Sequence, residues 1–208
     1  MGGFFISGGM MNRRALLMAA PALALSGCGR SRTVPTTGTT ARFLAAAHEQ
    51  TRHFVLYDSG YTRIAYPNGD VAPGKGVCAD VIVRAYRGVG IDLQRLVHED
   101  MTAHFDLYPK KWGLTAPDAN IDHRRVPNLR VFFSRFGHSL PVSQDPSAWK
   151  PGDLITNQPS GPHIAIVSDR MAPGSDRPMV IQNIGWGVKE DDQLFRYPIT
   201  GHYRYGLS

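Results

Sequence analysis

Two residues, Cys78 and His163, have the types needed for nucleophilic attack on a carbonyl group. Cys78 stands where a glycine-rich stretch passes into the amphipathic residues 78–87, so the pattern predicts a thiol in the first turn of a buried helix. The partial positive charge at a helix N-terminus stabilises a thiolate, which would lower the pKa of this thiol. His163 opens an apolar strand directly after a Ser-Gly-Pro turn, from which an imidazole can face a groove. Together they indicate cysteine hydrolase chemistry with histidine as the base.

The other cysteine, Cys28, belongs to a different pattern. A basic pair, Arg13-Arg14, precedes the apolar residues 15–25. This run is shorter than the ~20 residues that span a bilayer but has the length of a signal-peptide core. It ends in Leu25-Ser26-Gly27-Cys28, which matches the bacterial lipobox, whose cysteine accepts a lipid. We therefore expect residues 1–27 to be removed and Cys28 to be lipidated, which leaves Cys78 as a lone thiol rather than half of a disulfide.

The next residues connect the lipid to the folded part. Residues 28–40 are polar and contain proline, so they predict a flexible tether, followed by one domain over residues 41–208. Gly29 lacks the acidic character that often retains lipoproteins in the inner membrane. We expect the periplasmic face of the outer membrane, with the outer face of the inner membrane as the alternative. The sequence leaves the general and twin-arginine export routes open.

Charge and histidine spacing limit the other function classes. The net charge of +6 falls to about +4 without Arg13 and Arg14, and no basic run with interleaved aromatics indicates nucleic-acid binding. His98 and His104 are six residues apart, not the four that put two zinc ligands on one helix face. We expect polar contacts from them and from His123, no metal, no cofactor and a monomer.

The elements that must position Cys78 and His163 follow from periodicity. Helices come first and antiparallel strands later, which is the α+β pattern. Helices are expected over residues 41–57, 77–87, 93–105 and 129–136, and strands over residues 154–156, 163–168, 179–183, 194–197 and 202–205.

Several motifs in order carry a family resemblance. Besides Cys78, they are Tyr66-Pro67-Asn68-Gly69 twelve residues before it, Pro151-Gly152-Asp153-Leu154, and His163 with the apolar residues after it. This order resembles the NlpC-type cell-wall cysteine peptidases of the papain-like superfamily. Residues 76–81, 98–101, 120–129, 182–185 and 201–205 are more closely similar to the domain-of-unknown-function family 1287 within it, and the resemblance covers nearly all of residues 41–207.

The resemblance implies a papain-like fold, with a helix beginning at Cys78 packed on an antiparallel sheet. It places the group that orients His163 on the following strand, where Gln182 stands at a position at which we expect histidine in the family. Asn183 is the alternative, because neighbouring strand residues face opposite sides. Tyr66 would donate to the developing oxyanion.

The implied activity is cleavage of a peptide amide in peptidoglycan. Asp80 would either be stabilised by the helix dipole or bind a substrate amine, and Trp186 would either line the groove or be a rim aromatic without a role. About 85 residues separate Cys78 from His163, enough to reshape the groove. Two other functions therefore stay open: acyl transfer or hydrolysis on lipid, and a non-catalytic lipoprotein that binds the envelope.

Overall fold

The computed structural model describes residues 1–4 and 31–208. Its helices and strands are largely separated along the chain. Helices dominate the first part of the chain and a sheet the second, so the predicted α+β class is confirmed. The helices are α1 (Gly38–Gln50), α2 (Cys78–Arg87), α3 (Leu93–Ala103) and α4 (Val126–Phe136). The strands are β1 (Leu56–Tyr57), β2 (Lys75–Gly76), β3 (His138–Leu140), β4 (Leu154–Asn157), β5 (His163–Met171), β6 (Pro178–Asn183), β7 (Val188–Asp191) and β8 (Ile199–Arg204). Short 3-10 turns cover Phe105–Leu107, Asp122–Arg124 and Pro146–Ala148.

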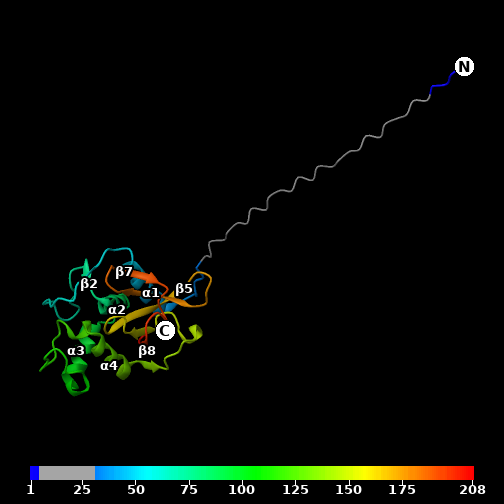
Figure 1. The fold of residues 1–208 in the computed structure, drawn as a ribbon. Coiled ribbons are helices and arrows are strands. Elements are labelled where there is room, and N and C mark those ends of the chain that lie inside the picture. Colours follow the sequence, from blue (N-terminus) through cyan, green and yellow to red (C-terminus); the bar gives the residue numbers. More distant parts are fainter. Residues whose placement is uncertain (5–30) are drawn as a thin grey trace.

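Six strands form one antiparallel sheet in the order β3-β8-β4-β5-β6-β7, and β1 and β2 pair in parallel beside it. Helix α2 packs between α1 and strands β5 and β6 (Figure 1). The largest buried side chains, among them Phe43, Tyr86 and Ile164, come from both layers. The core therefore fixes the start of α2 against the start of β5.

Two of the differences from the predicted elements concern the end of α1 and the edge of the sheet. Helix α1 ends at Gln50, because Thr51 closes a turn and the chain then pairs as β1 with Lys75 and Gly76. Residues 194–197 form no strand, although Leu194 is buried, and the edge of the sheet is instead Val188–Asp191. The chain there forms a turn, from which Leu194 packs into the core.

The segment before α1 is not wholly a free tether. Thr33 forms a β-bridge with Arg170, and the N–H of Val34 donates to the carbonyl of Asp169 at 2.7 Å. Residues 31–34 therefore lie on β5, which corrects the tether prediction for that part. The predicted signal peptide core and Cys28 lie outside the described residues. Within the described residues, no helix is long and apolar enough to cross a membrane.

The Pro-Gly-Asp turn before β4 has a structural role. Asp153 is fully buried and accepts hydrogen bonds from His202 Nε2 at 2.7 Å and Arg204 Nε at 2.7 Å, so it ties β4 to β8. Trp149 stacks on the His202 ring at 3.8 Å between centroids. This motif holds the sheet together behind the residues that could do chemistry.

Candidate active site

Cys78 is the first residue of α2, as predicted, and the local sequence explains why the helix begins there. Val77 has extended backbone angles, and its N–H donates to the Asp80 carboxylate at 2.6 Å, which caps the first turn. A Cβ on Gly76 would come within 3.2 Å of Asp80 Oδ2, so glycine suits the tight approach. The thiol therefore lies at a capped helix N-terminus.

The thiol is 3% exposed, and burial raises the pKa of Cys78 above its usual value. The N–H groups of Ile164 and Ala79 point at the sulfur and act in the opposite direction, as does a hydrogen bond from Tyr57. The expected lowering of the pKa by the helix terminus is thus outweighed by desolvation. In the free protein the group is a neutral thiol at neutral pH, so attack requires a base.

Tyr57 is a neighbour of the thiol that the sequence pattern did not reveal. Strand β1 pairs Tyr57 with Gly76, two residues before Cys78, and Tyr57 and Cys78 line the same cavity. Partial burial and the proximity of Cys78 raise the pKa of Tyr57 to about 12. The hydroxyl therefore keeps its proton and remains a donor. Because residues 41–57 were expected to be one helix, its position could not be predicted.

Tyr66, the predicted oxyanion donor, lies elsewhere. Its ring packs edge-on against His98 at 5.3 Å, it is 46% exposed, and it does not line the cavity that contains Cys78. The reason is local: Gln94 accepts from Gly69 N–H at 2.8 Å and donates to the Ala65 carbonyl at 2.9 Å. These bonds dock the Tyr66 turn on α3, away from the thiol.

His163 and Gln182 face each other across β5 and β6, with His163 Nε2 2.8 Å from Gln182 Oε1. The Gln182 amide N–H₂ donates to Asp191 Oδ1 at 2.8 Å, so its oxygen must face the imidazole. His163 Nε2 therefore carries the proton, and Nδ1 keeps a free lone pair. Burial lowers the pKa of His163, while the bond to Gln182 opposes this. Asp191, whose pKa burial raises, completes a chain that sequence analysis missed.

Asn183 points to the other side of β6, as the alternation of a strand requires. Its amide donates to the Gly76 carbonyl at 3.3 Å, and its oxygen accepts from Gly185 N–H. Asn183 thus contacts Gly76, two residues before Cys78, instead of His163.

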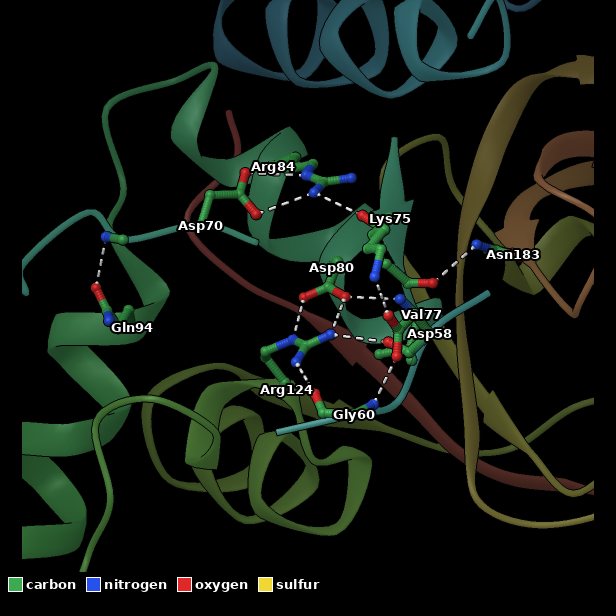
Figure 2. Close-up of polar contacts among 12 residues, drawn as sticks. Asp58, Gly60, Asp70, Lys75, Val77, Asp80, Arg84, Gln94, Arg124 and Asn183 are labelled. Carbon is green, nitrogen blue, oxygen red and sulfur yellow. Dashed lines mark hydrogen bonds and ion pairs between the residues drawn. The ribbon is translucent and has the colours of Figure 1, made fainter. Parts of the chain in front are cut away.

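Asp80 is buried and hydrogen-bonded within the protein. It is 3% exposed, and Arg124 contacts both of its oxygens, through Nε at 2.8 Å and Nη2 at 2.9 Å. Arg124 also donates to the carbonyl oxygens of Gly60 and Asp58, which follow Tyr57 (Figure 2). Together with the Val77 N–H, Asp80 accepts three hydrogen bonds from within the protein. The Asp80–Arg124 pair fastens the Tyr57 segment to the start of α2.

A cavity of about 340 Å³ opens at Cys78, with Tyr57, Trp112, Ile121, Arg125, Val126 and Pro162 among its walls. Trp112 and Arg125 come from the long segment between Cys78 and His163, and sequence analysis did not single them out. Trp112 has a positive φ of 62°, a conformation unusual for a bulky side chain. Trp186 is 84% exposed in the β6–β7 turn and is not among the residues that line this cavity.

The histidines considered for a metal are not brought together. His104 Nδ1 pairs with Asp100 at 3.0 Å, whereas His98 contacts Tyr66. Among the described residues, one group has the donor set for an ion: His48, Asp169 and Glu190, whose ligand atoms lie within 4.8 Å of one another. Arg170 and Ser168 already contact Glu190, and His48 Nε2 contacts Asp169 at 2.9 Å. Both carboxylates therefore have hydrogen-bonding partners within the protein.

Comparisons with known proteins agree with the predicted family. Residues 44–205 match the family model described as "Domain of unknown function (DUF1287)". The chain is 47% identical over 161 residues to the uncharacterized protein YijF of Escherichia coli (strain K12), covering 76% of this chain and 78% of that one.

Two solved structures of NlpC proteins from Trichomonas vaginalis are similar at lower levels. NlpC2 has 15% identity and a TM-score of 0.46, and NlpC1 has 16% identity and a TM-score of 0.43, each over 83% of this chain. This chain spans about half the length of each, 48% and 46%. The match over most of its length and the 47% identity to YijF establish that the chain belongs to the DUF1287 family.

Proposed function

We propose that the protein is a thiol hydrolase that cleaves a peptide amide bond, with peptidoglycan peptides as substrate. The observation that carries this proposal is the chain His163–Gln182–Asp191 on the sheet, with Cys78 at the start of α2, the helix that packs on β5. A thiol, a base with a free lone pair, and a group that fixes its tautomer are the parts that nucleophilic acyl transfer requires.

The proposed reaction begins from two neutral groups. His163 Nδ1 takes the Cys78 proton as the sulfur attacks the amide carbonyl carbon, and the carbon–nitrogen bond then breaks as His163 returns that proton to the leaving amine. Water next attacks the thioester with His163 again as base. The carboxylic acid leaves and the thiol is regenerated. Burial suits this sequence, because it lowers the pKa of His163 and keeps the imidazole unprotonated near pH 7.

Tyr57 takes the part expected of Tyr66. Its hydroxyl lies beside the sulfur and stays protonated, so it is placed to donate to the oxyanion that forms on the attacked carbonyl. The backbone N–H of Cys78, at the N-terminus of α2, would be the second donor.

Digestion of purified sacculi and of isolated muropeptides, analysed by mass spectrometry, tests this function. We expect wild type to release new amine and carboxylate ends and Cys78→Ala to release none. Phospholipid vesicles form the parallel arm. Cys78-dependent release of fatty acid, with muropeptides unchanged, would contradict the peptide assignment.

We further propose that Cys28 is lipidated and holds the domain at the membrane, on the periplasmic face of the outer membrane. The support is the lipobox ending at Cys28. Metabolic labelling with palmitate, followed by membrane fractionation, should label wild type and not Cys28→Ala. An unlabelled wild type that fractionates like Cys28→Ala would refute the anchor.

A further inference from the structure

The charged residues that line the cavity at Cys78 are all basic. Among its lining residues, the charged ones are Arg124 and Arg125, and no carboxylate contributes to its wall. The two arginines are adjacent in sequence but differ in how their N–H groups are used. The Arg124 guanidinium donates to Asp80 and to two carbonyl oxygens.

Arg125 retains most of its donors. Its contact with a carboxylate within the described residues is Nη1 to Asp122 Oδ1 at 3.5 Å, much longer than the 2.8 Å between Arg124 and Asp80. A guanidinium has five N–H groups, so one long contact leaves an edge available. The side chain is 17% exposed and lines the cavity at Cys78.

Trp112 lies against this guanidinium. The Arg125 guanidinium carbon lies 4.3 Å from the centre of the Trp112 ring, a cation–π stacking distance. Both side chains line the cavity at Cys78, so this cation–π pair forms part of its wall. A planar edge with paired N–H groups matches the two oxygens of a carboxylate.

We propose that Arg125, stacked on Trp112, forms a subsite for a carboxylate that the peptide carries next to the amide attacked by Cys78. This rests on the proposed function and narrows it to acidic peptides. The amine-binding alternative for Asp80 would select a cationic group of the substrate. The Arg125 subsite would instead select an anion beside the scissile bond.

Binding can be measured apart from cleavage, using Cys78→Ala as the background. Two synthetic peptides serve as probes, identical except that the residue beside the scissile amide bears a carboxylate or a carboxamide. We expect the carboxylate peptide to bind at least tenfold more tightly, since a charge-assisted pair of hydrogen bonds is worth roughly tenfold to hundredfold in affinity. Cys78→Ala/Arg125→Met should lose this preference, and Arg125→Lys should retain part of it.

Arg63→Met in the same background is the matched control, because Arg63 lies in the neighbouring depression that shares Trp112 but not in the cavity at Cys78. It should keep the preference, and thermal unfolding should show every variant folded. Equal binding of both peptides, or a preference that survives Arg125→Met, overturns the subsite.

Hydrolysis by the Cys78 protein separates the two proposals. A carboxylate preference that depends on Arg125, without cleavage of either peptide, would leave the subsite standing and refute the hydrolase. Cleavage of both peptides at equal rates would do the reverse. Binding of anionic phospholipid vesicles that depends on Arg125, with neither peptide bound, would overturn the assignment to peptides.

Discussion

At the scale of single residues, the orientation of His163 depends on a neutral amide. A carboxylate in place of Gln182 would stabilise the imidazolium and raise the pKa of His163 strongly. A neutral amide oxygen fixes the same tautomer with a smaller rise in that pKa. Asp191 fixes the orientation of the Gln182 amide, because Gln182 Nε2 donates to Asp191 Oδ1 at 2.8 Å and a flipped amide would lose this hydrogen bond.

Replacing Gln182 with alanine should lower kcat/KM for the muropeptide by about 10². The bond to Gln182 raises the pKa of His163 against the effect of burial, so its loss should also move the acid limb of the pH–rate profile to lower pH. The profile is the deciding readout, since a merely structural change would lower the rate without moving the limb. Lys189→Ala, opposite Gln182 on β7, is the matched control. An acid limb that stays in place in Gln182→Ala would contradict this role.

At the scale of elements, the buried pair Asp80–Arg124 joins three segments: the start of α2, the 3-10 turn before α4, and the chain after β1 (Figure 2). Both side chains are 4% exposed or less. Breaking a buried pair from one side leaves an uncompensated charge.

Asp80→Asn should therefore lower the free energy of unfolding by about 3–5 kcal/mol, measured by urea denaturation. Glu99→Gln removes the exposed partner of Arg95 and should cost at most about 0.5 kcal/mol. If the two variants are equally stable, the structural role of Asp80 is wrong.

Sequence patterns predicted the two elements that begin with a chemically reactive side chain. Cys78 at a helix start and His163 at a strand start both follow from local composition and periodicity. Tyr57 could not be found this way, because its approach to the thiol depends on a two-residue parallel pairing between segments eighteen residues apart. Tyr66 was assigned from spacing alone, and the contacts of Gln94 place its turn on α3. Trp112 and Arg125 lie in irregular chain, where periodicity carries no signal.

At the scale of the whole molecule, burial disfavours the charged form of two histidines, His123 and His163. Burial lowers the pKa of His123 to about 4, and the pKa of His163 is also lowered. An unfolded histidine titrates near 6.5, so below that pH the unfolded chain binds a proton that folded His123 does not. This contribution to stability is complete above pH 6.5 and is lost as the pH falls towards 4.

The free energy of unfolding should thus fall by roughly 3 kcal/mol between pH 7 and pH 4 through His123 alone. Urea denaturation across this range should show a shallower decline for His123→Phe than for wild type. A variant whose decline matches wild type would show that His123 is not the group responsible.

The central claim is that Cys78 forms the covalent bond to substrate, and one comparison tests it most directly. Wild type and Cys78→Ala are incubated with the same muropeptide, and both new amine ends and the mass of the protein are followed. We predict cleavage by wild type, with an acid-quenched acyl adduct that maps to the peptide containing Cys78, and no cleavage by the variant. Cleavage by Cys78→Ala at the wild-type rate would contradict the account.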